Sequence, residues 1–386
     1  MSGSWRIGQI SGIGIYLHWT FLILLAWVGL TYFVQGSDLM DTLHGVVFVV
    51  ALFTVVVLHE LGHALAARRY GIPTKDITLL PIGGVARLER MPTDPGQELV
   101  VALAGPAVNV VLAALCVACV LLLAGASGIA ASLAAGMAEL GFVAGDHARL
   151  PALSGLPLVG AHVLAKMMVV NVVLAVFNLL PAFPMDGGRV LRAVLAMRIS
   201  YVQATQVAAS VGQAMALLFG FVGLFFNPFL VFIALFIWMG ATSEASMVQM
   251  RASLHGIPVV HAMATEFRTV SPTDPIAEAA RHVIAGFQHD FPVLEGGRLA
   301  GVLTKNDLLK ALAEKGVDEP VGNVMQRDFE RADPSEMLES VFARLQACQC
   351  HAIPVVRGDD LVGIVTMENV GEFLAIRAAL TVGRAA

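Results

Sequence analysis

Residues 57–64 read VLHELGHA and contain two histidines, His59 and His63, four positions apart. On a helix this spacing places both imidazoles on one face, about one turn apart, where they can share a metal ion. Glu60 lies beside them. The preceding run, residues 45–58, is almost entirely apolar, and a charged side chain near the centre of a membrane helix costs roughly 2.5–3.5 kcal/mol. The motif therefore predicts a metal site in a helix that is apolar enough to lie in a membrane. Because two histidines alone do not complete such a site, a third ligand is needed.

The composition is that of an integral membrane protein. Of the 386 residues, 57% are hydrophobic and only 14% are charged, which is too apolar for an ordinary soluble chain. The apolar character ends near residue 250, so we expect a membrane domain over residues 1–250 and a soluble domain after it. A net charge of −5 leaves no basic surface for nucleic acid, and we expect no nucleic-acid partner.

Six apolar runs are long enough to cross about 30 Å of hydrocarbon. They lie at residues 16–34, 43–66, 98–124, 161–181, 204–226 and 228–248. Lys and Arg follow the second, fourth and sixth runs, whereas the alternate loops hold little beyond Arg149. This distribution predicts that both termini and the soluble domain lie in the cytosol. The connection at residues 125–160 is interpreted as an external loop, with a short extra helix or a re-entrant segment as the alternative.

A short β-hairpin is predicted between the second and third runs. Residues 77–80 and 85–88 have strand character and flank a turn at Gly83 and Gly84, at the membrane surface. An exposed edge of this hairpin could accept an unwound peptide as an added strand. A plain structural connection is the alternative, and the sequence does not separate the two.

Two later segments carry polar residues at membrane depth. Asn109 lies in the third run, where it could hold substrate or a catalytic neighbour, or form an ordinary interhelical hydrogen bond. The fourth run ends in NLLPAFPMDGGR, residues 178–189, where two prolines and two glycines break the helix around Asp186. Irregular backbone at this depth lines cavities. Asp186 is therefore the candidate third metal ligand, with a helix-end carboxylate paired to Arg189 as the alternative.

An internal repeat follows residue 255, with an offset of 62 residues and no gap. FPV at 291–293 aligns with IPV at 353–355, and LAGVLT at 299–304 aligns with LVGIVT at 361–366. Each unit has the pattern helix, strand, turn, strand, helix. The sequence thus predicts a tandem α/β repeat of soluble type over residues 255–315 and 318–380.

The membrane half resembles the site-2 protease family of intramembrane zinc metalloproteases. The matching motifs are HELGH at 59–63, GPAVN at 105–109 and NLLPAFPMDGG at 178–188, and LHWT at 17–20 fits the compact subfamily with cytosolic regulatory domains. The resemblance covers residues 10–250. It implies a polytopic helical membrane domain that cleaves a transmembrane segment of another membrane protein, in regulated intramembrane proteolysis within a prokaryotic cell membrane.

The resemblance also implies roles for the polar residues. One catalytic Zn²⁺ is expected on His59, His63 and Asp186, with a fourth position left for water. Glu60 is the expected general base. Asn109 and Asn178 are expected to orient substrate or to stabilise the oxyanion.

The carboxy-terminal repeat resembles a pair of CBS domains, in which a Gly-x-x-Thr-x-x-Asp segment helps to bind adenine nucleotides. Residues 301–307, GVLTKND, match this segment in full, which implies Asp307 at the ribose and Thr304 near a phosphate of ATP, ADP or AMP. In the second repeat Thr366 matches but Asn369 replaces the Asp, so a charge-assisted acceptor is lost. Helix caps are the alternative for both sites. The pair also offers a surface for a homodimer.

Two other functions fit parts of the pattern. A CBS-gated ion transporter or channel would place the same His and Asp residues along an ion path. A catalytically inactive scaffold would keep only the nucleotide sensor, although a full set of metal ligands with Glu60 argues against it. Glu60 separates the protease from the transporter, because only the protease needs a general base. Cys348 and Cys350 suit a reducing compartment.

Overall fold

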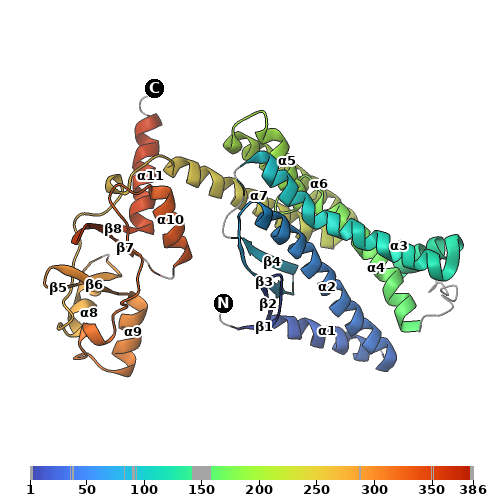
Figure 1. The fold of residues 1–386 in the computed structure, drawn as a ribbon, viewed down its shortest axis with the longest axis horizontal. Coiled ribbons are helices and arrows are strands. Elements are labelled where there is room, and N and C mark those ends of the chain that lie inside the picture. Colours follow the sequence, from blue (N-terminus) through green and yellow to red (C-terminus); the bar gives the residue numbers. More distant parts are fainter. Residues whose placement is uncertain are drawn as a thin grey trace. The chain divides into compact units, whose positions relative to one another are not determined.

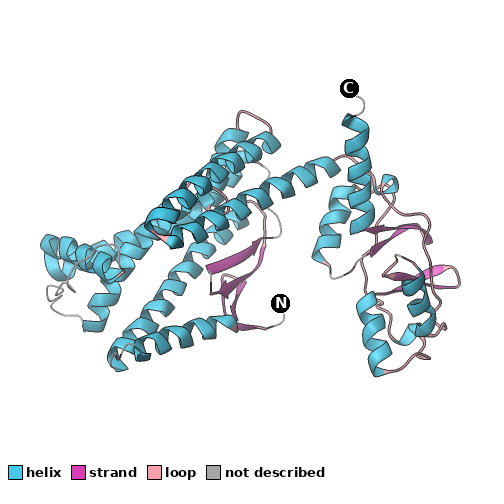
Figure 2. Cartoon of the chain, turned by 180° about the vertical axis from the view of Figure 1, so that it is seen from behind, coloured by secondary structure: helices cyan, strands magenta, loops and turns pink. Residues whose placement is uncertain are grey.

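The computed structural model describes residues 3–34, 36, 39–81, 83–88, 92, 94–140, 158–286, 288–348, 350 and 352–382 (Figure 1). The chain divides into two compact units, Met1–Ser246 and Met247–Ala386. The first unit combines long helices with one small sheet, and the second combines short helices with strand pairs (Figure 2).

The elements of the first unit are, in chain order, β1 (Ser4–Ile10), β2 (Ile13–His18), α1 (Thr20–Val34), α2 (Leu39–Arg69), β3 (Thr74–Leu80), β4 (Gly83–Leu88), α3 (Pro95–Glu139), α4 (Leu158–Asn178), α5 (Asp186–Ala196), α6 (Tyr201–Phe226) and α7 (Pro228–Leu254). Each of the six expected apolar runs contributes a helix, namely α1, α2, α3, α4, α6 and α7. The predicted polytopic helical fold is confirmed.

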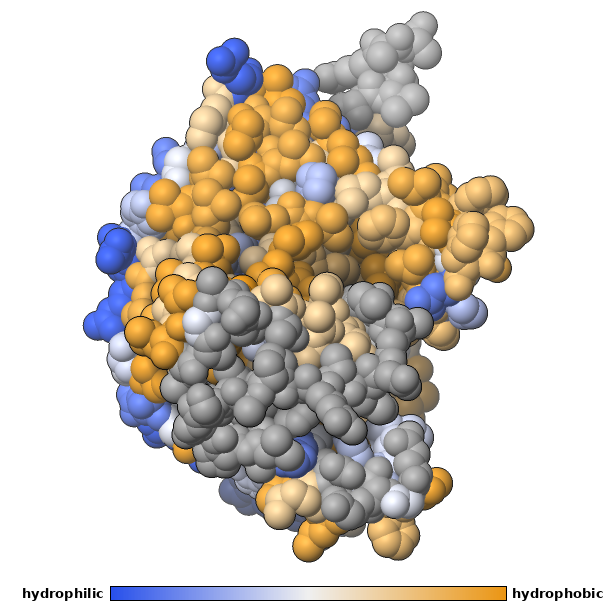
Figure 3. Space-filling model, turned by 90° about the vertical axis from the view of Figure 1, so that its right-hand side faces the viewer, coloured by the Kyte–Doolittle hydropathy of each residue, from blue (hydrophilic) through white to orange (hydrophobic). Residues whose placement is uncertain are grey.

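Four helices in the described part of the chain are long and apolar enough to cross a membrane. These spans are Thr42–Arg69, Pro95–Leu122, Tyr201–Phe226 and Pro228–Leu254, and two shorter apolar helices lie at Thr20–Val34 and Val163–Asn178. Only 17–28% of the most apolar window of each long span is buried within the protein. The remaining apolar side chains face outward and cover most of the coloured surface of one face (Figure 3), so lipid must surround them.

The external loop expected at residues 125–160 is wrong in its first part, where the structure has a helix, as in one of the alternatives kept from the sequence. Helix α3 continues to Glu139, with a break at Gly125, whose φ of 68° and ψ of −174° are not helical. Because positive φ carries little penalty only for glycine, the chain bends here and then resumes its helical path. Residues 141–157, the rest of the expected loop, lie outside the described residues.

The predicted hairpin is part of a larger sheet. The described strands of the first unit form one sheet in the order β1-β2-β3-β4, in which β2 and β3 are parallel and the other pairs are antiparallel. Gly83 and Gly84 begin β4 rather than forming the turn. Ile77 and Leu79 are buried beneath the sheet, against α2 among other elements. β2 was missed because its apolar residues run almost directly into the first apolar helix, and β1, which pairs with β2, was missed with it.

A cross-strand ion pair connects β3 and β4. The Arg87 guanidinium donates to the Asp76 carboxylate, and this hydrogen bond raises the pKa of Arg87. The ion pair links the two strands where their register shifts, between Thr74 and Ile77.

A buried guanidinium joins three helices of the first unit. Arg192 on α5 is fully buried, and its Nε donates to Glu98 of α3 at 2.8 Å while its Nη1 donates to Glu244 of α7 at 2.5 Å. The same guanidinium stacks on the rings of Phe183 and Tyr201, 5.0 and 4.9 Å from the ring centroids. A charge at this depth is tolerated only when it is paired, so the cluster fixes α5 against its neighbours.

We expect Arg192→Leu to lower the free energy of unfolding by about 3–5 kcal/mol, because it leaves the Glu98 carboxylate buried without a cation. Unfolding in detergent, followed by circular dichroism, measures the loss. Arg198→Leu is the matched control, since Arg198 is exposed just after α5. Equal stability of the two variants would contradict this account of the cluster.

The second unit contains two similar halves. Its elements are α8 (Ile276–Ala285), β5 (Phe291–Glu295), β6 (Arg298–Leu303), α9 (Lys305–Glu314), α10 (Leu338–Ala347), β7 (Ala352–Arg357), β8 (Asp360–Thr366) and α11 (Met367–Val382), with single 3-10 turns at Val259–His261 and Val321–Asn323. Each half has its own apolar core. A disulfide joins Cys348 and Cys350, unlike the free thiols expected in a reducing compartment.

The halves exchange short segments with each other. Ala264 pairs with Ile364 of β8, and Gln326 pairs with Val302 of β6. Adding the repeat offset of 62 residues to Ala264 gives Gln326, and subtracting it from Ile364 gives Val302, so the two contacts are equivalent. The repeat found in the sequence is therefore a structural repeat with reciprocal pairing.

Candidate metal centre

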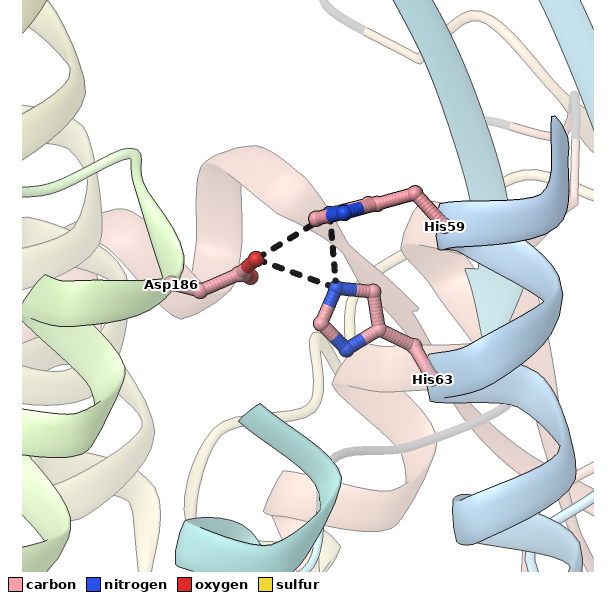
Figure 4. Close-up of side chains that lie close together, drawn as sticks. All are labelled: His59, His63 and Asp186. Carbon is pink, nitrogen blue, oxygen red and sulfur yellow. Dashed lines mark hydrogen bonds and ion pairs between the residues drawn. The ribbon is translucent and has the colours of Figure 1, made fainter. Parts of the chain in front are cut away.

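Three side chains meet at the predicted metal site. His59 and His63 project from α2, and Asp186 projects from the first turn of α5 (Figure 4). The two Nε2 atoms lie 3.1 Å apart, and the Asp186 Oδ2 lies 3.2 Å from His59 and 3.1 Å from His63. All three residues are buried. The structure thus brings together the three residues proposed as ligands, although His63 and Asp186 are 123 residues apart in the chain.

The donor set fits a tetrahedral zinc ion. Ligand atoms about 2.0–2.1 Å from Zn²⁺ at tetrahedral angles lie about 3.3 Å from one another, close to the three separations given above. Two imidazole nitrogens and one carboxylate oxygen are ligands typical of catalytic zinc sites, which keep a fourth position open.

The outer nitrogens of both histidines bond to α3. The His59 Nδ1 lies 3.0 Å from the Asn109 Oδ1, and the His63 Nδ1 lies 2.7 Å from the Val101 carbonyl oxygen. Since both partners are acceptors, each Nδ1 carries its proton and each Nε2 presents a lone pair toward the centre. Such partners orient metal-bound imidazoles and make them better ligands.

Gly105 of α3 leaves the room for the two rings. A Cβ at this position would lie 2.2 Å from the His63 Nε2 and 2.7 Å from the His59 Nε2. Gly62 of α2 makes a comparable close approach to the Ala104 carbonyl. These glycines therefore let α2 and α3 pack closely enough for α3 to supply the acceptors.

The loop before α5 places Asp186. Gly187 and Gly188 face the backbone of Leu180 and Ala182 so closely that a Cβ on either would lie within 2.6 Å of a backbone atom. Gly240 of α7 makes a similarly close approach to Pro184. The two prolines and two glycines noted in the sequence thus fold the loop tightly and direct the aspartate inward.

Glu60 faces the same cavity as the metal ligands. Its Oε2 accepts the Ala86 N–H of β4 at 3.3 Å. The cavity has a volume of about 730 Å³ and is lined mainly by apolar residues from α2, β4 and α4, together with the loop before α5. Its size is that of a site for a substantial ligand. Glu60 is therefore positioned by the edge of the sheet, a contact with no signature in the sequence.

The two asparagines have different surroundings. Asn109 is fully buried and holds His59, while its Nδ2 has no hydrogen-bond partner. Asn178 lines the cavity, but its Nδ2 donates to the Leu174 carbonyl of its own helix at 3.0 Å. Asn109 thus contacts His59, a proposed metal ligand, as one of the alternatives from the sequence had it. Arg189 also lines the cavity, and its guanidinium lies 3.8 Å from the Asp186 Oδ1.

The predicted nucleotide residues occupy matching positions in the second unit. Thr304 caps α9 and its Oγ1 donates to Asp307 at 2.6 Å, and Gln326 also donates to that carboxylate, at 2.7 Å. In the second repeat the Thr366 Oγ1 lies 2.7 Å from the Asn369 Oδ1. A helix cap at Asp307 or Asn369 was the alternative from the sequence, but the threonine is the cap in each repeat. The Thr304 Oγ1 accepts the Asp307 N–H at 3.2 Å, and the Thr366 Oγ1 accepts the Asn369 N–H at 3.1 Å.

Comparison with known proteins agrees with this geometry. Residues 47–219 match peptidase family M50, and residues 259–314 and 321–375 each match the CBS domain. A zinc metalloprotease of Methanocaldococcus jannaschii is 30% identical over 379 residues, which cover 97% of each chain. The chain belongs to peptidase family M50. The expected resemblance is confirmed, and this M50 protein is a zinc metalloprotease and an integral membrane protein.

Two further relatives extend the comparison. Stage IV sporulation protein FB of Bacillus subtilis is 24% identical over 270 residues, covering 67% of this chain and 82% of the relative. The solved site-2 protease of Methanocaldococcus jannaschii is 33% identical and covers 63% of this chain and 95% of its own, with a TM-score of 0.41.

We expect Gly105→Ala to remove zinc from the purified M50 protein, because the added methyl group would occupy the space of the His63 Nε2. Metal analysis should find a near-stoichiometric ion in the native chain and little in the variant. Gly29→Ala is the matched control, since a Cβ on this helical glycine meets nothing within 4 Å. A Gly105→Ala protein that retains zinc would contradict the packing described here.

Proposed function

We propose that this metalloprotease hydrolyses a peptide bond within or near a transmembrane segment of another membrane protein. The proposal rests on one observation: Glu60 and the His59–His63–Asp186 cluster line the same cavity. Membrane helices and strand β4 together form the walls of that cavity. The substrate is then a protein that shares the bilayer.

The proposed chemistry divides between the metal and the protein. Zn²⁺ held by His59, His63 and Asp186 would polarise the scissile carbonyl and lower the pKa of water toward about 7. Glu60 would accept the proton from the attacking water and deliver it to the leaving amine. Asn178 and Arg189, on the cavity wall, are candidates to orient the substrate or to stabilise the oxyanion, and Asn109 is proposed to act through His59.

A transmembrane helix must unwind before it can be cut, because its backbone groups are all paired within the helix. The free edge of β4 offers a place for the unwound segment. Ala86 directs its N–H away from β3 and toward Glu60, and the alternation of a strand makes the Gly84 N–H point the same way. An added substrate strand would therefore lie between β4 and the metal ligands.

Glu60→Gln tests the general base. We expect peptide cleavage to fall about 10²–10⁴-fold, the usual contribution of such a group, while bound zinc stays unchanged. Asp186→Ala should lose both zinc and cleavage, since it removes a ligand. A cleavage assay in proteoliposomes with a membrane-spanning substrate, combined with metal analysis, separates the two effects. Full activity of Glu60→Gln would exclude Glu60 as the base.

Photo-crosslinking tests strand addition at β4. Val85 is 45% exposed and lines the cavity, so a photoreactive amino acid at this position in a Glu60→Gln background should form an adduct with the substrate. Leu217 of α6 is exposed but does not line the cavity, and the same group there serves as the control. Equal labelling from both positions would remove the strand-addition proposal.

The soluble unit is proposed to regulate the protease. Thr304 with Asp307, and Thr366 with Asn369, are the proposed contacts for an adenine nucleotide, supported by the CBS match. The distribution of Lys and Arg supports cytosolic termini and cytosolic CBS domains. The membrane is proposed to be that of a prokaryotic cell. A homodimer through the CBS pair belongs to the same proposal.

A further inference from the structure

The two carboxylate oxygens of Asp186 have different neighbours. Oδ2 faces the Nε2 atoms of His59 and His63 at 3.2 and 3.1 Å (Figure 4), whereas Oδ1 lies 3.8 Å from the Nη1 of Arg189. Among the described residues, no hydrogen-bond donor reaches Oδ1. The guanidinium of Arg189 is therefore the group that engages the carboxylate oxygen on the side away from the histidine contacts.

The position of Arg189 on α5 lets it reach this oxygen. It lies three residues after Asp186, and side chains at this spacing are neighbours on one face of a helix. Between them lie only Gly187 and Gly188, which carry no side chains. Arg189 lines the cavity, and its side chain is 30% exposed, against 8% for Asp186. The ion pair is thus partly buried, where opposite charges attract more strongly than at an open surface.

Arg192, one turn further along α5, has a different task. Its guanidinium is fully buried and paired with Glu98 of α3 and Glu244 of α7. In the described part of the chain, by contrast, Asp186 is the only ion-pair partner of Arg189. Arg192 therefore fixes the helix, and Arg189 is left to hold the carboxylate.

The number of oxygens that Asp186 gives to a metal ion decides what else can bind there. Carboxylates bind metal ions through one oxygen or through both. Catalytic zinc sites combine three protein ligands with a fourth position for water, and a second carboxylate oxygen would crowd that position. It would also add negative charge, which opposes the lowering of the pKa of water by zinc.

We propose that Arg189 is a positioning residue that keeps Asp186 a one-oxygen ligand of zinc. The inference rests on the proposed zinc ligands and the proposed protease function, and it adds a task for Arg189. The guanidinium offsets the charge of Oδ1, so this oxygen competes poorly for the metal. Orientation of the substrate, the other role considered for Arg189, differs because it acts only after the substrate has bound.

The visible absorption spectrum of the Co²⁺-loaded, full-length protein in detergent tests the inference. Four-coordinate Co²⁺ absorbs visible light more strongly than five-coordinate Co²⁺, so the spectrum reports the number of donors. We expect Arg189→Met to retain its metal but to absorb more weakly than the native protein, because Oδ1 becomes a fifth donor. With zinc, kcat for a membrane-spanning substrate should fall about 10–100-fold, while KM stays unchanged.

Two further variants separate charge from space and from general effects. Arg189→Lys keeps a cation and should keep the native spectrum and most of the activity. Since Lys and Met have similar volumes, entry of an extra water would weaken the spectra of both variants alike. Arg198→Met removes an exposed guanidinium outside the cavity and should change neither the spectrum nor kcat.

Four outcomes would overturn the inference and leave the proposed function standing. One is a native spectrum in Arg189→Met, which together with a raised KM would assign Arg189 to the substrate instead. Equal weakening in the Met and Lys variants is the second, and loss of metal from Arg189→Met is the third, because an added donor should not weaken metal binding. The fourth is an unchanged kcat in Arg189→Met. A native protein that holds no zinc or cleaves no substrate would overturn the proposed function itself.

Discussion

The close contact between α2 and α3 at Gly105 is the constraint on which the metal centre depends. Two imidazoles in an apolar helix need acceptors for their outer nitrogens, and α2 cannot supply them because its backbone is used within the helix. α3 provides one backbone carbonyl and one amide oxygen, but only where the helices approach without an intervening Cβ. The two Nε2 atoms proposed to bind the metal therefore point inward because of residues that are not themselves proposed ligands.

A second buried polar cluster in the membrane unit is also held together by paired charges. Arg192 places a full charge in the interior, yet two carboxylates and two aromatic rings surround it. Because the removal of any partner leaves a buried charge or dipole, such clusters hold helices in one arrangement rather than simply adding stability. Among the described residues, the Asn109 Nδ2 beside the proposed metal site and the Glu98 Oε2 are buried without a hydrogen-bond partner.

Much of this organisation could be predicted from the sequence, but not all of it. The spacing of His59 and His63 fixes a shared helix face, and the broken helix around Asp186 indicates a residue at a cavity. The acceptor for His63 could not be predicted, because a backbone carbonyl has no side-chain signature. β2 escaped notice because its apolar residues merge into the first apolar run, and β1, which pairs with it, escaped notice as well. Gly125 was interpreted as part of a loop although a single residue with positive φ lets a helix bend and continue. Arg192 looked like one of several basic residues near a membrane surface.

Helix α7 has an unusual place in the chain, since it runs from Pro228 to Leu254 while the compact units meet between Ser246 and Met247. Its last residue, Leu254, is fully buried in the apolar core of the second CBS repeat. A chain that ends at Ser246 would therefore cut α7 before its last residue. A separately expressed CBS unit would have to begin within α7 to keep Leu254 in its core.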